Sequence, residues 1–181
     1  MSKTPLITVL IVTHNRPNFL EKAVDSVFAQ TLTDYEIVIV GNQLTETNKK
    51  HLVEISKRSD AIRIFFLDTK AGSAASRNLG VNNARGDYIA FLDDDDIWLP
   101  NKLEKQLFEF ERYPEAGLVY SYAYLLEQGK DKVFVPDYES KDTFQELLEK
   151  CFIYSTSLAM VRRSAFDLPA TIPGRYLEKK E

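Results

Sequence analysis

Short runs of β-branched and other apolar residues alternate with helical periodicities over the first half of this chain. The stretches between the runs carry apolar residues at helical spacing, most clearly from Phe19 to Phe28. Strands that alternate with helices predict an α/β fold with a mostly parallel central sheet and helices on both faces. Four runs are typical of strands buried on both faces of such a sheet: residues 7–12, 37–40, 62–67 and 88–92.

The second half of the chain has a different pattern. We expect a helix over residues 100–112 and then one aromatic strand over residues 118–126. On that strand Tyr120, Tyr122 and Tyr124 would share one face, as a core, an interface or a sugar-stacking surface. The remaining expectations are a turn at 128–132, a strand at 133–135, a helix at 143–150, a strand at 157–161 and a charged tail at 175–181.

Composition excludes several classes of protein. The 181 residues are 44% hydrophobic with only 7 Gly and 7 Pro, so the chain can bury a core and is not a disordered or low-complexity protein. A net charge of -4 gives no global field that would attract nucleic acid, and we expect no nucleic-acid partner. One cysteine and two histidines make an internal disulfide and a Cys/His zinc site improbable.

The sequence carries no sign of a targeting or membrane-spanning segment. Residues 1–5 lead directly into a strand-like run, unlike a signal peptide. The most apolar stretch, residues 118–126, is much shorter than the roughly 20 residues that span a bilayer. We therefore expect a cytoplasmic protein.

Four consecutive aspartates, Asp93 to Asp96, follow the strand at residues 88–92 directly. Ligands of parallel sheets bind at the carboxyl ends of the strands, so this position is a candidate site. Adjacent carboxylates repel one another, and Mg²⁺ or Mn²⁺ would neutralise them while completing its coordination with water and substrate phosphates. The alternative is a solvated acidic loop, but apolar residues flank the run on both sides and favour the metal.

Two other loops at the same edge carry polar candidates. Thr13, Asn15 and Arg16 follow the first strand, where they could hold a base or ribose. His14 lies between them and fits an orienting or packing role better than a metal-binding one. Arg77 lies in a helix that begins after small residues, and it could reach a phosphate. The alternative for Arg77 is an ordinary ion pair with a surface acid.

Five segments follow one another in a characteristic order: VLIVTHNR (9–16), SVFAQT (26–31), ASRNLG (75–80), ARGDYIAFLDDDD (84–96) and LPNKL (99–103). This order resembles the family 2 glycosyltransferases with the GT-A fold. The resemblance covers residues 6–106, with a weaker match at 157–165. It implies a Rossmann-like nucleotide-binding half, a nucleotide-diphospho-sugar donor, a divalent metal bound through an Asp-x-Asp motif, and inversion at the anomeric carbon.

The resemblance also implies roles for individual residues. Asp93 would approach the ribose and, with Asp95, bind the metal, while Asp94 would assist. Arg77 would line the donor pocket, and Thr13, Asn15 and Arg16 would contact the nucleotide. One domain over residues 1–181 would then comprise a nucleotide-sugar-binding part at about 6–98 and a partial acceptor part at about 99–181.

The chain departs from the family pattern at two places. Where the family has paired acids that read the base, this chain has Gly41, Asn42, Gln43 and Leu44, so Asn42 becomes the candidate for the base edge. The family's catalytic base lies in a Glu-Asp pair beyond residues 161–164, and here Glu178 is the candidate.

Two alternatives to a sugar transferase are a catalytically silent nucleotide-sugar-binding module and a nucleotidyltransferase. The second is disfavoured because no Gly-rich loop with Lys or Arg follows the first strand. For the transferase we expect a saccharide or lipid-linked acceptor, used in surface polysaccharide or glycoconjugate synthesis. A lipid-linked acceptor would allow peripheral contact with a membrane. The sequence indicates no oligomeric state.

Overall fold

The computed structural model describes residues 4–68, 72–127, 130–134 and 153–167. Strands and helices alternate over its first half, as the sequence predicts, and strands dominate the second half. The elements in chain order are β1 (Ile7–Thr13), α1 (Pro17–Phe28), β2 (Tyr35–Asn42), α2 (Glu46–Ser56), β3 (Ile62–Leu67), α3 (Gly72–Asn83), β4 (Tyr88–Asp93), α4 (Lys102–Arg112), β5 (Leu118–Tyr120), β6 (Ala123–Glu127), β7 (Lys130–Phe134), the 3₁₀ helix η1 (Thr156–Leu158), β8 (Ala159–Arg162) and the 3₁₀ helix η2 (Arg163–Phe166).

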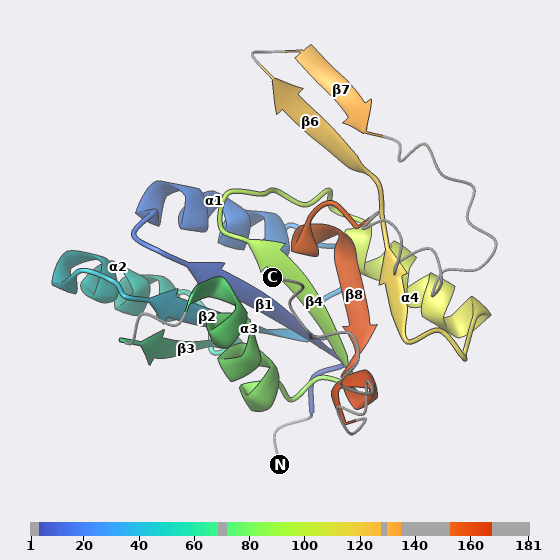
Figure 1. Cartoon of the computed structure of the whole chain (residues 1–181), viewed down its shortest axis with the longest axis horizontal. Helices are drawn as coiled ribbons and strands as arrows, with labels where there is room; N and C mark the ends of the chain where they lie inside the picture. Colours follow the sequence, from blue (N-terminus) through green and yellow to red (C-terminus); the bar gives the residue numbers. More distant parts are fainter. Residues whose placement is uncertain (1–3, 69–71, 128–129, 135–152, 168–181) are drawn as a thin grey trace, which may run out of the picture.

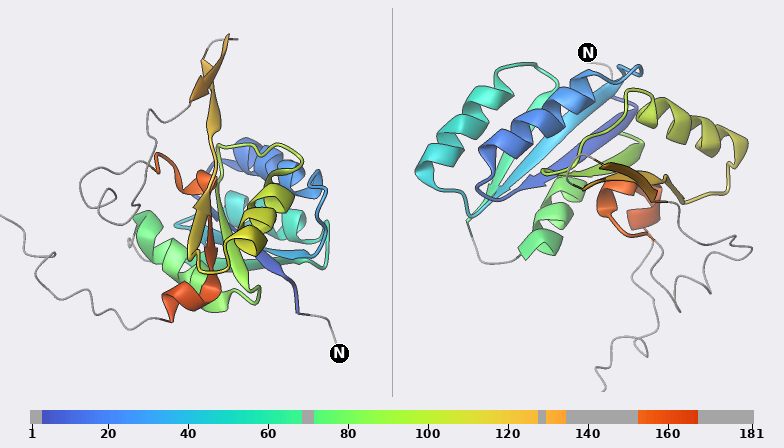
Figure 2. Two further views of the ribbon diagram at one scale, coloured as in Figure 1. Left: turned by 90° about the vertical axis from the view of Figure 1, so that its right-hand side faces the viewer. Right: turned by 90° about the horizontal axis from the view of Figure 1, so that it is seen from above.

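The main sheet has six strands in the order β3-β2-β1-β4-β8-β5 (Figure 1). The first four of these strands pair in parallel, whereas β8 pairs antiparallel with both β4 and β5. The predicted α/β fold with a mostly parallel sheet is therefore confirmed. A separate hairpin of β6 and β7 projects away from this sheet in both Figure 1 and Figure 2.

Helices cover both faces of the sheet, also as predicted. Side chains of α1, α2 and α4 pack with one set of strand residues, and α3 packs on the opposite face (Figure 2). The two sets arise because successive strand residues point to opposite faces, so Val9 and Leu10 belong to different clusters. Gly80 lets α3 approach β1 closely, since a Cβ there would overlap Leu10 Cδ1.

The strand order creates a switch point between β1 and β4. The chain runs outward from β1 through β2 to β3, and α3 then returns it to the other side of β1. Helices on opposite faces leave the carboxyl ends of β1 and β4 uncovered between them, where open α/β sheets bind ligands. The register pairs Val12 with Asp93, so the loop after Thr13 lies beside the acidic run.

The second half departs from the sequence prediction in its strands. The single strand expected at residues 118–126 is two strands, because Ser121 N–H donates to Leu158 O at the main sheet while β6 turns away to pair with β7. Tyr120, Tyr122 and Tyr124 therefore do not share one strand face. The turn expected at 128–132 extends too far, because β7 already begins at Lys130.

Four further expectations concern the end of the chain. The strand expected at residues 157–161 begins only at Ala159, because η1 occupies the preceding residues. The helix expected at 143–150, the tail at 175–181 and the candidate base Glu178 lie outside the described residues. Within the described ranges, none of the helices has the length and apolarity that spanning a membrane requires.

Candidate functional site at the sheet switch point

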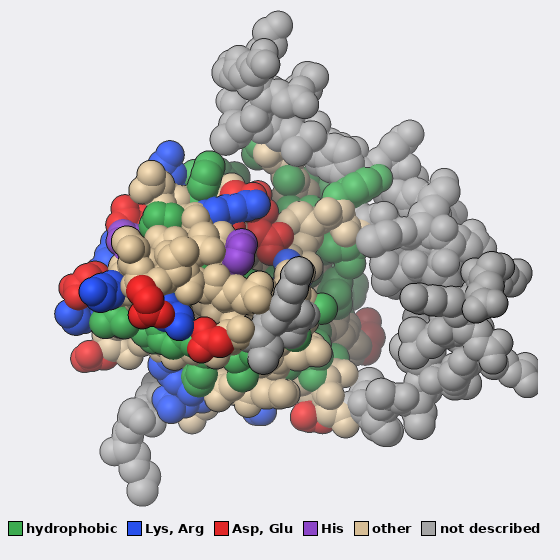
Figure 3. All heavy atoms as spheres, turned by 60° about the vertical axis from the view of Figure 1, so that its left-hand side comes forward, with side chains coloured by type: hydrophobic (Ala, Val, Ile, Leu, Met, Phe, Trp, Pro, Cys, Tyr) green, Lys and Arg blue, Asp and Glu red, His purple; other side chains and the backbone are tan. Residues whose placement is uncertain are grey.

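A cleft of about 270 Å³ lies at the carboxyl ends of β1, β2 and β4. Figure 3 shows this end of the sheet, where acidic, basic and histidine side chains lie close together. The structure brings together all the predicted donor-binding and metal-binding residues that it describes, apart from Asn15. The cleft is lined by Val12, Thr13, His14, Arg16, Asn42, Ser73, Arg77, Asp93, Asp94 and Asp95.

The four aspartates form a tight turn in which Asp96 N–H donates to Asp93 O at 3.1 Å. Asp94 is buried and accepts a 2.7 Å hydrogen bond from Thr13 Oγ1. Burial raises the pKa of Asp94, and the Thr13 hydrogen bond and the Arg16 charge oppose this shift. Asp94 thus joins the ends of β1 and β4.

Arg16 forms the second link between the two loops. Its Nη1 lies 2.6 Å from Asp95 Oδ2 and 3.6 Å from Asp94 Oδ1. About half of the Arg16 and Asp95 side-chain surfaces is exposed, at 52% and 48%. Water weakens an ion pair this exposed to about 0–1 kcal/mol, so both groups can exchange partners when a charged ligand enters the cleft.

Arg77 approaches the acidic turn from α3, on the other face of the sheet. Its Nη2 donates to Asp93 Oδ1 at 2.7 Å and to Thr156 Oγ1 at 3.0 Å. The sequence left open whether Arg77 binds a phosphate or pairs with an acid. The structure pairs it with an acid, and it does so inside the cleft rather than on an unrelated surface.

The acidic run does not by itself form a cluster of metal-binding side chains among the described residues. Among the described residues, no three His, Cys, Asp or Glu side chains converge in a way that could hold a metal ion. In the structure, Arg16 pairs with Asp95, and both Arg77 and the Thr156 hydroxyl contact the Asp93 carboxylate. Asp93 and Asp95 nevertheless line the same cleft, and two carboxylates with ligand phosphates and water are sufficient for Mg²⁺ or Mn²⁺. The residues present fit such an ion.

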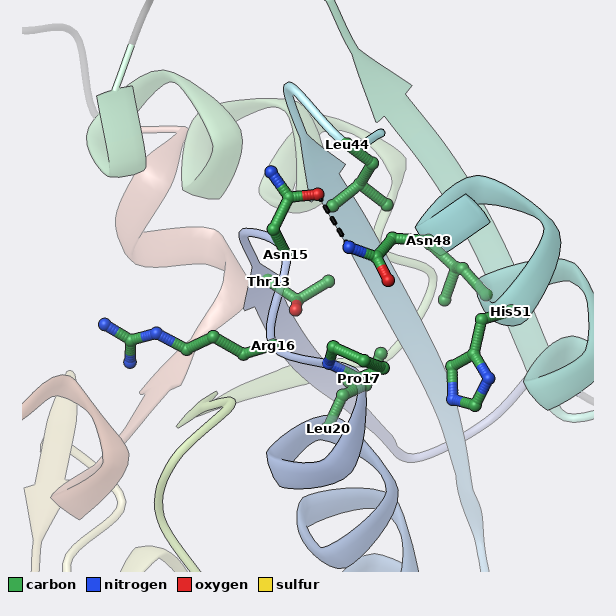
Figure 4. A pocket seen from close by; sticks show the side chains of 9 residues that line it. Thr13, Asn15, Arg16, Pro17, Leu20, Leu44, Asn48 and His51 are labelled. Atoms are coloured by element: carbon green, nitrogen blue, oxygen red, sulfur yellow. Dashed lines mark hydrogen bonds between the residues drawn. The ribbon is translucent and has the colours of Figure 1, made fainter. Parts of the chain in front are cut away.

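Asn15 has a supporting position instead of a place in the cleft. Its φ of 53° is in the left-handed region, which asparagine tolerates better than most residues. Its Oδ1 accepts from Thr45 N at 2.9 Å and from Asn48 Nδ2 at 2.8 Å (Figure 4). Asn15 therefore fixes the β1 loop to the start of α2, beside a small hollow that Thr13, Asn15 and Arg16 help to line (Figure 4).

Asn42, at the end of β2, has a buried side-chain oxygen, Oδ1, that lacks a hydrogen-bond partner among the described residues, although the residue lines the cleft. Its backbone oxygen lies 2.7 Å from His14 Nδ1, and because a carbonyl only accepts, the geometry assigns the proton to Nδ1. His14 thus orients the loop, which is one of the two roles that the sequence favoured.

Three hydroxyl residues at the site were not predicted from the sequence. Ser155 Oγ donates to Asp96 Oδ2 at 3.3 Å, Thr156 Oγ1 donates to the Asp93 carboxylate, and Ser157 Oγ accepts from Asp93 N at 2.8 Å. The run lies just before β8, which is antiparallel to β4, so it meets the end of β4. Three consecutive hydroxyl residues were the only signal in the sequence for this part of the site. The sequence did not show that β8 is antiparallel to β4, and a parallel β8 would have placed these residues at the opposite end of the sheet.

Trp98 is an anchor of this segment. Its side chain is buried, and Nε1–H donates to Ser157 O at 3.0 Å. These contacts anchor the loop between β4 and α4 to the segment before β8.

Comparison with known proteins decides the family. Residues 8–168 match the family described as Glycosyl transferase family 2. This chain belongs to that family. It is 34% identical over 153 residues to an uncharacterized glycosyltransferase of Methanocaldococcus jannaschii, covering 82% of this chain and 51% of the relative. A Bacillus subtilis glycosyltransferase, TuaG, whose name assigns it provisionally to teichuronic acid biosynthesis, is 37% identical over 109 residues. This match covers 60% of this chain and 43% of the relative.

Solved structures confirm the GT-A type of fold for this family 2 chain. Residues 1–349 of S. aureus TarS superpose with a TM-score of 0.70 at 18% identity, over 89% of this chain and 48% of that one. The mannosyltransferase PcManGT from Pyrobaculum calidifontis, solved with GDP-Man and Mn²⁺, superposes with a TM-score of 0.68 at 17% identity. This match covers 92% of this chain and 47% of that one. This chain spans about half the length of the first of these relatives and of both structures.

Proposed function

We propose that this chain carries the donor-binding half of a metal-dependent, inverting glycosyltransferase that moves a sugar from a nucleotide-diphospho-sugar to an acceptor hydroxyl. The observation that carries the proposal is the cleft at the switch point, where two arginines, three aspartates and an unsatisfied amide oxygen meet. Membership of the family supports it, as does the similar fold of a mannosyltransferase solved with a nucleotide sugar.

The two arginines suit a diphosphate. Arg16 and Arg77 reach the cleft from opposite sides of the acidic turn, and both side chains are partly exposed, at 52% and 26%. Departure of a nucleoside diphosphate from the sugar develops negative charge on its phosphates. Cations already fixed in the cleft would stabilise this charge more in the transition state than in the bound donor.

Asp93 and Asp95 are the residues we assign to a divalent ion, Mg²⁺ or Mn²⁺. When bound, the ion would supply positive charge beside the leaving phosphate. Arg77 and Arg16, which pair with these two aspartates in the structure, could also donate to phosphate oxygens of the donor. Asp94 would keep its bond to Thr13 and hold the turn in place.

Asn42 is the residue we assign to the nucleotide base. Asn42 lines the cleft, and its amide can accept from an N–H on a base edge through Oδ1 and donate to a neighbouring carbonyl through Nδ2. A neutral amide does not select for charge, so the proposal leaves the choice between uracil and guanine to experiment. The similar folds that were solved with UDP-GlcNAc and with GDP-Man allow either base.

Inversion requires a carboxylate on the acceptor side that takes the proton from the attacking hydroxyl. Glu178 remains the candidate for this base. A saccharide or lipid-linked acceptor in surface polysaccharide synthesis fits the relative whose name refers to teichuronic acid.

Calorimetric titration tests donor binding directly. UDP and GDP are titrated into the full chain with Mn²⁺ and again with EDTA, and we expect tighter binding with the metal. Asp95→Asn should abolish the effect of the metal while the melting temperature of the free chain stays close to the parent value. Asp96→Asn is the matched control, because Asp96 belongs to the same turn but does not line the cleft.

Two results would contradict the proposal: absence of binding by the parent chain, or an equal response to metal in the parent and in Asp95→Asn. Sugar transfer is a separate step of the proposal. Mass spectrometry of the chain incubated with UDP-sugars or GDP-sugars and Mn²⁺ distinguishes donor turnover from the silent binding of an inactive module.

A further inference from the structure

Thr156 lies at the centre of a closed set of hydrogen bonds beside the cleft. Its Oγ1 is 3.0 Å from Asp93 Oδ1, 3.1 Å from Asp93 Oδ2 and 3.0 Å from Arg77 Nη2. Arg77 Nη2 also donates to Asp93 Oδ1 at 2.7 Å. The guanidinium can only donate and the carboxylate can only accept, so the hydroxyl accepts from Arg77 and donates to Asp93.

We propose that Thr156 is a positioning residue of the donor site, which sets the orientation of the Asp93 carboxylate and of the Arg77 guanidinium toward the cleft. The inference rests on the proposed function, since both partners are residues we assign to metal and phosphate. A carboxylate held at both oxygens by one hydroxyl cannot rotate freely about its terminal bond. The carboxylate therefore loses its conformational entropy when the chain folds, and binding of the ligand does not have to order it.

The segment that carries Thr156 is itself held from behind. Trp98 Nε1 donates to Ser157 O at 3.0 Å, and Gln106 Nε2 donates to Leu158 O at 2.8 Å. Asp93 N–H donates to Ser157 Oγ at 2.8 Å, so a neighbour of Thr156 also fixes the backbone of Asp93. Buried side chains of the β4–α4 region therefore place the hydroxyl independently of any ligand.

Thr156→Val tests the proposal, because valine keeps the shape of threonine and removes only the hydroxyl. UDP or GDP, whichever the parent chain binds more tightly, is titrated calorimetrically with Mn²⁺. We expect about tenfold weaker binding or more, the usual effect of losing a hydrogen bond to a charged group. Thr156→Ser should restore binding. Thr33→Val, at an exposed residue just before β2 and at the other end of the sheet, is the matched control.

A double-mutant cycle with Asp93→Asn separates positioning from folding. If Thr156 acts through the Asp93 carboxylate, Thr156→Val should weaken binding far less in the Asp93→Asn background than in the parent. Equal affinity of Thr156→Val and the parent would overturn the inference and leave the proposed function standing. Equal losses in both backgrounds, or failure of Thr156→Ser to restore binding, would also overturn it. A parent chain that binds neither nucleotide would overturn the proposed function and this inference with it.

Discussion

Lys102 provides a test of the packing behind the site through the pH dependence of stability. The residue is buried, and its Nζ donates to Gln106 Oε1 at 2.6 Å and lies 4.0 Å from the centre of the Trp98 ring. The ring favours the charged form, but loss of hydration is the larger effect, and burial lowers the pKa of Lys102 from 10.5 to about 7.

The sign of the effect follows from where the proton binds. Between pH 7 and pH 10.5 the unfolded chain keeps the Lys102 proton and the folded chain releases it, so the free energy of unfolding rises with pH. With these two pKa values, the gain between pH 7 and pH 9 is about 2 kcal/mol. Below pH 7 both states are protonated, and the cost of the buried ammonium group is complete.

Lys102→Met isolates this contribution, since methionine keeps much of the side-chain volume and does not titrate. Urea unfolding of the parent and the variant is followed at pH 7, 8 and 9 through the fluorescence of Trp98, the single tryptophan. We expect the parent to gain about 2 kcal/mol more than the variant over this range. The difference between pH values is diagnostic, whereas a value at one pH also contains the cost of leaving Gln106 Oε1 without its donor.

Lys105→Met is the matched control, because Lys105 is exposed on the same helix and should leave the pH response unchanged. Parallel pH responses of the parent and Lys102→Met would refute the reasoning. They would mean that the ammonium group stays charged in the folded chain.

Two further predictions concern packing around the cleft. Thr13→Val should lower the free energy of unfolding by about 1–3 kcal/mol, because it removes the hydroxyl that the buried Asp94 carboxylate accepts from; Thr13→Ser should retain most of the stability, and denaturant titration would measure both. Gly80→Ala should cost about 1–3 kcal/mol in the same assay, because its Cβ would overlap Leu10 Cδ1. Gly117→Ala is the control for this change, since a Cβ there meets nothing within 4 Å; similar costs for the two alanines would argue against the overlap.

Much of the fold could be predicted from residue pattern alone. Four runs of apolar residues gave four strands within one or two residues of their observed bounds, and helical spacing gave the helices between them. The reason is that a parallel sheet covered on both faces requires continuous apolar strands, which few other structures need. The second half was predicted less well, since short antiparallel strands such as β5 and β8 depend on partners far away in sequence.

The candidate site was predicted in its location more than in its contacts. Strand ends and polar loops indicated the edge of the sheet, and the resemblance indicated residues such as Arg77 and Asp95 that line the cleft. The pattern did not indicate that Asn15 turns toward α2, because that depends on the positions of Thr45 and Asn48 in space.

The sequence by itself determined the alternation of strands and helices, the acidic turn after β4 and the polar loops at one edge of the sheet, because each depends on neighbouring residues. Only the tertiary structure decided how the charges of that edge are compensated. Arg16, Arg77 and Thr156 are 79, 16 and 63 residues from the aspartates they contact. Strand order and the antiparallel entry of β8 bring them together, and no local pattern encodes a contact made across such separations.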